Sequence, residues 1–151
     1  MPQSLSAVYV HLIFSTKERY SWLRDPDFRG EVHAYLGGIS KKLECPPIIV
    51  GGVEDHVHVV ARLGRSISQA EWVKEIKRVS CAWIKKRECG SSGFAWQSGY
   101  GVFSVSASRL DDVRDYVARQ EEHHRELSFQ DELKMFLRAY GVEWDERYVW
   151  E

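Results

Sequence analysis

Apolar positions along the chain first predict four strands. Residues 7–14 are rich in β-branched and aromatic side chains, which is typical of a strand. Residues 48–53 and 56–63 are two further apolar runs, and the gap of two residues between them has the length of a hairpin turn. Residues 94–108 predict a last strand, which contains glycines that favour kinks.

A different spacing, with apolar residues three and four positions apart, predicts the helices. It runs over 28–43, with Asp25 or Asp27 as the N-terminal cap, and over 66–87, with Ser66 or Ser68 as the cap and Gly90 after the end. A third helix is expected over 110–124 with Ser108 as its cap. One short helix follows in the tail and ends at Gly141.

The predicted order is β-α-β-β-α-β-α, a split βαβ arrangement. We therefore expect the α+β class: a ferredoxin-like, RNA-recognition-like antiparallel sheet with helices on one face. No repeat or linker divides the chain, so residues 1–151 are interpreted as one domain and residues 125–151 as its C-terminal helical extension. Because this fold hosts many functions, function has to be argued from the site.

Composition narrows the class of protein but does not indicate a ligand. The chain is 44% hydrophobic and 28% charged over 151 residues, as in an ordinary globular protein. The first residues do not resemble a signal peptide, and the run 7–14 is too short to cross a membrane. The odd set Cys45, Cys81 and Cys89 lacks metal-ligand spacing, which favours reduced thiols in the cytoplasm. A net charge of −1 gives no hint of a nucleic-acid partner, which a local patch would have to hold.

Two histidines stand out in the strand "HVHVVARL". Alternate side chains of a strand share a face, so His56 and His58 project together while Val57 and Val59 project the other way. They either line a sheet face without a ligand or converge on one cation, and Asp55 is placed to orient a ring. Two nitrogen ligands do not complete a metal site, so a third ligand is needed.

The third predicted helix carries candidates for that ligand. Its apolar stripe contains two polar residues one turn apart, in the order Val113, Tyr116, Val117 and Gln120. Burying an unpartnered polar group costs roughly 1–3 kcal/mol, so Tyr116 and Gln120 require either a function or an edge position where they reach water. His123 and His124 fit a solvated helix end, where the helix dipole favours cations.

Together these motifs resemble the single-tyrosine HUH transposase superfamily, which includes insertion-sequence transposases and repetitive-palindrome-associated tyrosine transposases. The resemblance runs from Val8 to Gln120, and the tail looks like an extension found in part of the group. It rests on the segments "VYVHLIFSTKERY", "EDHVHVV", "WQSGYGVFSVS" and "YVARQ".

The resemblance implies an activity and a set of roles. His56, His58 and Gln120 would be metal ligands and Tyr116 the nucleophile. Asp55 would not touch the ion but would accept a hydrogen bond from a ligating histidine and orient its ring. The ion would be Mg²⁺ or Mn²⁺, although this donor set could also take zinc. The enzyme would cleave and rejoin single-stranded DNA at hairpin-bearing sites through a 5′-phosphotyrosine intermediate. It also makes a homodimer an option. From the spacing of one turn we expect Tyr116 and Gln120 to share one rigid helix, and from the shortness of the apolar runs we expect no membrane partner.

Local basic patches would have to bind the DNA. One candidate is a cationic ridge on the second helix, formed by Lys74, Lys77 and Arg78. The other lies in the loop after the first strand and contains Lys17 and Arg19. The ridge could equally be a solvated face with interspersed glutamates. Tyr20, Trp22 and Trp96 could stack on unpaired bases or belong to the core.

Two other functions stay open. The first is a non-catalytic single-stranded nucleic-acid-binding ferredoxin-like module, which is disfavoured because "FAWQSGYGVFSVS" matches the aromatic ribonucleoprotein motif poorly. The second is a metal hydrolase that uses a metal-bound water, with Tyr116 in a structural role.

Overall fold

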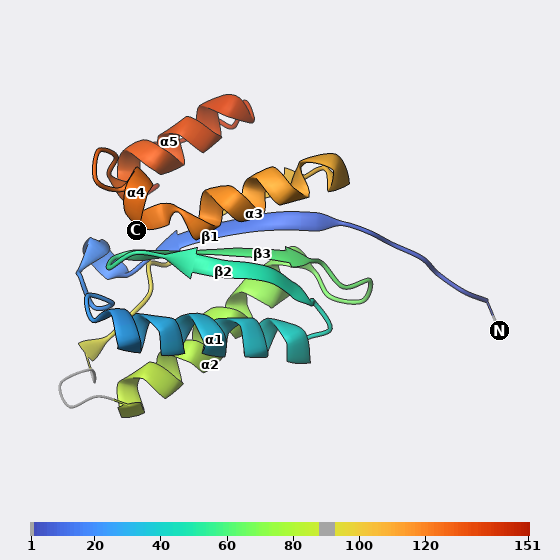
Figure 1. Cartoon of the computed structure of the whole chain (residues 1–151), viewed down its shortest axis with the longest axis horizontal. Helices are drawn as coiled ribbons and strands as arrows, with labels where there is room; N and C mark the ends of the chain where they lie inside the picture. The colour runs from blue at the N-terminus through green and yellow to red at the C-terminus, as the bar shows by residue number, and fades with distance from the viewer. Residues whose placement is uncertain (1, 88–92) are drawn as a thin grey trace.

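The sheet and its two helical layers are shown in Figure 1. This computed structural model describes residues 2–87 and 93–151. Within these residues four antiparallel strands pair in the order β2-β3-β1-β4; they are β1 (Tyr9–Ser15), β2 (Pro47–Gly52), β3 (His56–Arg62) and β4 (Gly101–Val105). The ferredoxin-like α+β fold predicted from the sequence is confirmed. None of the helices in the described ranges is long and apolar enough to cross a membrane.

Helices cover both faces of this sheet, whereas we expected helices on one face only. The long helices α1 (Pro26–Lys42) and α2 (Gln69–Arg87) pack together on one face, as predicted. The C-terminal helices lie over the other face in Figure 1; they are α3 (Leu110–Ala118), α4 (Gln120–His123) and α5 (Phe129–Ala139). Short 3₁₀ turns at Lys17–Arg19 (η1) and Ala107–Arg109 (η3) follow β1 and precede α3.

Several helix ends lie where the sequence predicts them. The Asp25 carboxylate accepts the backbone N–H of Asp27 at the start of α1, and Ser68 Oγ accepts the N–H of Glu71 at the start of α2. Gly141 follows α5 with a φ of +68°, the conformation that glycine adopts most easily after a helix. The expected end of α2 at Gly90 lies outside the described residues, as does Cys89.

The last strand is shorter than predicted. Only Gly101–Val105 pairs with β1, and residues 94–100 contribute a single bridge between Thr16 and Trp96. The Lys77 ammonium on α2 donates to the carbonyls of residues 97, 98 and 99 over 2.8, 3.3 and 2.6 Å. These carbonyls therefore point at a cation rather than at a neighbouring strand.

The predicted helix over 110–124 is broken. Arg119 leaves helical geometry with φ −105° and ψ 29°, so α3 and α4 are separate elements. Ser108 does not cap α3, because its hydroxyl contacts Ser106 Oγ instead. Helix α3 packs against β2 at Gly51, where a Cβ would lie 2.8 Å from Val117 Cγ1. Glycine at this position therefore sets how closely α3 approaches the sheet.

Alternation along the central strands divides the interior into two parts. Leu12 and Phe14 of β1 face α1 and α2 in the main apolar core, which also includes Val57 and Val59 of β3. Ile13 faces the other layer, where it packs in a smaller cluster with Phe103, Phe129, Leu133 and Leu137. On β3 the residues that alternate with these valines are His56 and His58, which lie opposite Ser15 and Ile13 of β1.

Candidate functional site

The β3 histidines are buried beneath the C-terminal helices. His56 and His58 are both 0% exposed, and the pleat of β3 turns both rings away from the main apolar core. Their ring centroids are 5.2 Å apart. Buried imidazoles need polar partners for both ring nitrogens, so the groups around them define the site.

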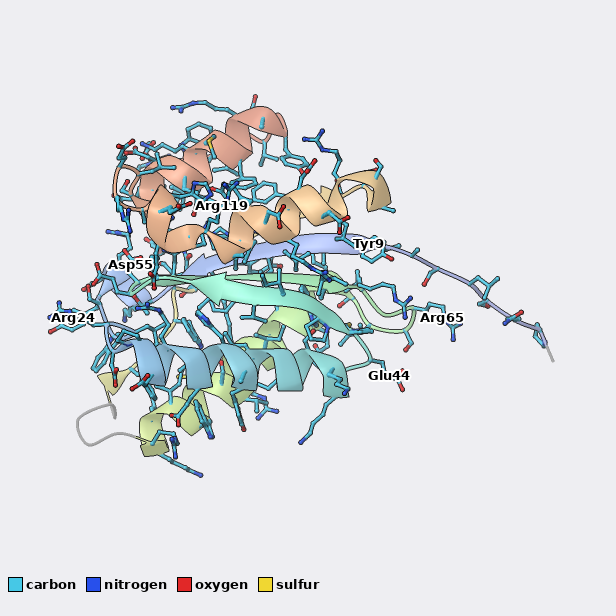
Figure 2. All side chains as sticks on the ribbon, in the orientation of Figure 1. Tyr9, Arg24, Glu44, Asp55, Arg65 and Arg119 are labelled. Atoms are coloured by element: carbon cyan, nitrogen blue, oxygen red, sulfur yellow. The ribbon has the colours of Figure 1, made fainter. Side chains whose placement is uncertain are left out.

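One nitrogen of each ring is held by a neighbour outside the centre of the site. His56 Nδ1 lies 2.7 Å from Asp55 Oδ1, and His58 Nδ1 lies 2.7 Å from Nε2 of His11, which is itself buried on β1. Figure 2 shows Asp55 at the end of the sheet opposite to Arg65. The two contacts fix the ring orientations and direct both Nε2 atoms inward.

A carboxylate from α5 lies where these nitrogens converge. Glu132 is 0% exposed, and its Oε1 lies 3.2 Å from His56 Nε2 and 3.0 Å from His58 Nε2. The same oxygen is 3.0 Å from Nε2 of His124, whose side chain is 8% exposed. His124 is therefore part of the site. The sequence-based interpretation of His124 as part of a solvated helix end was wrong.

Tyr116 and Gln120 reach the same carboxylate from α3 and α4. The Gln120 amide donates to Glu132 Oε2 over 3.0 Å, and its Oε1 is 3.1 Å from His56 Nε2. The Tyr116 hydroxyl donates a short hydrogen bond to Glu132 Oε2. The structure thus brings together the four residues singled out by their sequence pattern, which are His56, His58, Tyr116 and Gln120. They meet around Glu132, which the pattern did not indicate.

Tyr116 and Gln120 lie on two separate helices, not on one as the sequence predicted. We expected one rigid helix to carry both, but the break at Arg119 places Tyr116 on α3 and Gln120 at the start of α4. The stretch "RQEEHH" has no glycine or proline that would reveal a break in the sequence. Gln120 and His124, which follow the break, both contact buried Glu132. These contacts stabilise the broken helix relative to a continuous one.

His123 lies beside the phenol rather than in solvent. Its ring stacks on that of Tyr116 with 4.4 Å between centroids, and its Nε2 is buried without a hydrogen-bond partner among the described residues. The Tyr116 ring also meets Phe136 of α5 edge-on, with 5.8 Å between centroids. The side chain of Tyr116 is therefore held between α4 and α5.

Burial and charge shift the protonation of these groups in opposite directions. Burial lowers the pKa of His56, but hydrogen bonds to Asp55 and Glu132 outweigh burial and raise it to about 9. Burial dominates at His58, whose pKa falls to about 4. Burial, and then the charge of Glu132, raise the pKa of the Tyr116 phenol. Burial also opposes ionisation of Glu132, but hydrogen bonds from the three imidazoles hold the pKa of that carboxyl well below its usual range.

Metal binding is chemically compatible with this cluster. One donor atom from each of four residues lies within 4.8 Å of all the others; the residues are His56, His58, His124 and Glu132. Imidazole nitrogen and carboxylate oxygen are ordinary metal ligands, and Asp55 and His11 already hold the far nitrogens as partners of ligating histidines commonly do. The donors present therefore fit a divalent ion.

Comparisons with known proteins identify the family. The sequence profile described as "Transposase IS200 like" matches residues 4–120. The chain belongs to the IS200-like transposase family. No curated protein sequence is significantly similar to it. The match makes the chain a DNA transposase by family, and it ends before His124 and α5.

Two solved structures share the fold of this transposase. A candidate transposase from Deinococcus radiodurans R1 has a TM-score of 0.60 and 21% identity, with 80% of this chain and 95% of that chain covered. A REP-associated tyrosine transposase bound to a REP hairpin has a TM-score of 0.59 and 13% identity, with 82% and 72% covered. At these identities the likeness concerns the fold alone.

The basic residues of the transposase that we considered for DNA binding lie in two places. Lys74 and Arg78 are exposed on α2, on the opposite side of the sheet from the histidines, and Arg78 is paired with Glu75 at 2.7 Å. Lys77, also on α2, is engaged by backbone carbonyls. Lys17 and Arg19 lie in η1, directly after the end of β1 that pairs with His56.

The aromatic residues considered for base stacking differ in their exposure. Trp96 is 7% exposed and donates its indole N–H to Ser80 Oγ, so it belongs to the core. Trp22 packs against the same core. Tyr20 is 66% exposed and remains accessible to a ligand.

Proposed function

We propose that this chain is a metal-dependent single-strand DNA transposase of the HUH type. It would cleave and rejoin DNA at hairpin-bearing sites through a 5′-phosphotyrosine intermediate. The observation that carries the proposal is the meeting of the Tyr116 hydroxyl with the His56, His58 and Gln120 side chains around one buried carboxylate. We further propose one domain over residues 1–151, with the extension 125–151 included, a cytoplasmic location and an optional homodimer.

In this reaction the Tyr116 oxygen attacks the phosphorus of a DNA phosphodiester. A bond forms between the phenol oxygen and phosphorus while the bond to the 3′ oxygen breaks, and the leaving 3′ oxygen takes a proton. Holding the reacting atoms in line supplies roughly 7–11 kcal/mol of such a barrier. A divalent ion held by His56, His58 and Gln120 would neutralise charge that develops on the phosphate. The free 3′-hydroxyl can later attack a phosphotyrosine and rejoin strands.

The chain's own residues prepare the nucleophile for this step. Stacking of the Tyr116 ring on His123 and its contact with Phe136 restrict the phenol, and Glu132 Oε2 accepts its proton in a hydrogen bond. Because burial and the Glu132 charge raise the pKa of the phenol, Tyr116 is protonated in the protein without DNA. The phenol proton has to leave during the attack, which balances the proton that the 3′ oxygen takes. Glu132 Oε2 orients the phenol O–H by its hydrogen bond, and the lowered pKa of that carboxyl makes it a weak base.

The proposed substrate is single-stranded DNA that carries a hairpin. It rests on the family and on the solved transposase of the same fold that is bound to a REP hairpin. Lys17 and Arg19, which follow the end of β1 beside His56, are placed to meet the strand near the site. Lys74, Lys77 and Arg78 are retained as a second, more distant candidate patch.

A labelled hairpin oligonucleotide with randomised single-stranded flanks tests the activity. With Mn²⁺ or Mg²⁺ present, the 3′-labelled strand should become covalently attached to the protein on a denaturing gel. The 5′-labelled fragment should be released with a free 3′-hydroxyl. Tyr116→Phe should abolish the adduct and leave DNA binding intact, whereas Tyr148→Phe, which alters a tyrosine that is 60% exposed, should leave both unchanged.

The same experiment separates the other functions. A binding module would retain the DNA but produce neither adduct nor cleavage. A metal hydrolase that uses water would cleave without an adduct, and its cleavage would survive Tyr116→Phe. Either result would overturn the proposal.

A further inference from the structure

Helix α5 contributes a charged residue to the interior of the protein. The apolar residues of α5 recur at helical spacing and pack in the smaller cluster; they are Phe129, Leu133, Phe136 and Leu137. Glu132 lies on this same stripe, and the helix is anchored at its start by Ser128, which caps the N–H of Asp131. The position of the carboxylate is therefore set by a firmly packed helix rather than by a loose tail.

Such a carboxylate requires partners because burial of a charge is costly. Removing an ionised group from water without compensation costs several kcal/mol or more. Glu132 has compensation on both oxygens: Oε1 meets the three imidazoles at 3.0–3.2 Å, and Oε2 accepts from Gln120 and Tyr116. An apolar residue would fill this position without that requirement, so the charge points to a role in binding.

We propose that Glu132 and His124 are ligands of the same ion as His56 and His58. The inference rests on the proposed function, because it concerns the ion of that site. The donor set then comes from β3, the α4–α5 connection and α5, so the C-terminal extension completes the metal centre. Since the other Glu132 oxygen accepts the Tyr116 hydroxyl, one carboxylate joins the ion to the nucleophile.

This donor set selects among divalent ions. Mg²⁺ prefers oxygen ligands and usually keeps several waters, whereas imidazole nitrogen suits transition metals such as Mn²⁺ and Co²⁺ better. Three imidazoles and one carboxylate therefore favour Mn²⁺ over Mg²⁺ at equal concentration. A set limited to two imidazoles and an amide would favour it less, so the ion preference reports whether His124 and Glu132 take part.

Calorimetric titration of the full chain with MnCl₂ and MgCl₂, without DNA, tests the assignment. The wild type should bind Mn²⁺ at least about tenfold more tightly than Mg²⁺. Glu132→Gln should weaken Mn²⁺ binding by about 30-fold or more, and His124→Gln by about tenfold, because each replaces a carboxylate or imidazole ligand by a neutral amide that binds the ion more weakly. The matched control Glu126→Gln changes an exposed carboxylate of the same segment and should leave the affinity unchanged.

Two further measurements keep the result interpretable. Circular dichroism verifies that each variant is folded, and Glu132→Asp, which keeps the carboxylate on a shorter stem, should recover part of the Mn²⁺ affinity lost in Glu132→Gln. The visible spectrum of the Co²⁺ protein should change in Glu132→Gln, since its intensity depends on the ligands of the ion. Unaltered spectra would contradict direct ligation.

The outcomes separate this inference from the proposed function. If the wild type binds Mn²⁺ and Glu132→Gln binds it equally well or better, Glu132 competes with the ion and the ligand assignment is overturned, while a site of His56, His58 and Gln120 stands. If the wild type binds neither ion, both proposals fail. If Glu132→Gln and His124→Gln lose affinity as expected, the extension belongs to the metal centre.

Discussion

Leu12 and His11 are neighbours on β1, and both are almost completely buried, at 0% and 2% exposure, yet they face opposite layers. Leu12 packs in the apolar core beneath α1 and α2. His11 contacts His58 beneath the C-terminal helices. The same division continues across β3, where Val57 and Val59 face one layer and His56 and His58 face the other. Two central strands thus support a layer that stabilises the fold and a layer that gathers chemical groups.

The two layers differ in what a substitution removes. Apolar packing is non-directional, so a truncated side chain loses buried area and leaves a cavity. A buried polar network depends on particular pairs of atoms, and removal of one member leaves the others unsatisfied. Changes in the first layer should therefore alter stability, and changes in the second should alter ion binding and chemistry.

The largest expected effect is on the apolar layer. Leu12→Ala should lower the free energy of unfolding by about 2–5 kcal/mol, because the Leu12 side chain is fully buried where β1 packs against α1 and α2. Urea denaturation measures the change, with Leu5→Ala, at a position 81% exposed, as the matched control. The Mn²⁺ affinity of the folded fraction should stay the same; a parallel loss would show that the layers are not separable.

In the polar layer, the largest effect should come from His58. His58→Ala should weaken Mn²⁺ binding by about 100-fold, equivalent to about 2.7 kcal/mol, and abolish DNA cleavage while the fold persists. The loss follows from the inward-facing Nε2, which lies 3.0 Å from Glu132 Oε1. Calorimetry and the covalent-adduct assay measure both effects, with Glu126→Gln at an exposed position as the control. An unchanged cleavage rate would remove His58 from the site.

A smaller effect is expected one step behind the ligands. Asp55→Asn should reduce Mn²⁺ affinity by about 10–100-fold, because such partners orient a ligating histidine without touching the ion. Asp55 Oδ1 lies 2.7 Å from His56 Nδ1, and the amide can replace this contact only in part. Asp27→Asn, at an exposed position of α1, serves as the control. Equal affinities in the two variants would mean that His56 is oriented by other contacts.

Short-range features of both layers can be predicted from the sequence. The alternation around His56 and His58, and the cap at Asp25, depend on residues a few positions apart, and the structure agrees with them. The length of β4 does not follow in this way, because Lys77 from α2 engages the carbonyls before it. A pattern within residues 94–108 contains no information about that distant cation.

The polar layer shows the same limit more strongly. Tyr116, Gln120 and the β3 histidines were singled out by their spacing, but Glu132 meets His58 across 74 positions of the chain. One sequence signal could have revealed it: a glutamate on the apolar stripe between Phe129 and Leu133 is unusual in a helix that buries that stripe. Its partners, by contrast, follow only from the tertiary structure.

The smallest expected effect concerns which layer meets DNA. Lys17 follows β1 on the side where Ser15 pairs with His56, whereas Lys74 is exposed on α2 across the sheet from the site. Lys17→Ala should therefore weaken single-stranded DNA binding by about 3–10-fold and reduce the salt dependence by about one phosphate contact.

Fluorescence anisotropy at several salt concentrations compares Lys17→Ala with Lys74→Ala. Both positions are exposed, and both substitutions remove one positive charge, so the pair is matched in chemistry and differs in layer. Lys74→Ala should change the affinity by less than about twofold, since a strand bound at the histidines does not need to cross to α2. A larger effect at Lys74 than at Lys17 would mean that DNA wraps both layers, and the α2 ridge would then be the main binding surface.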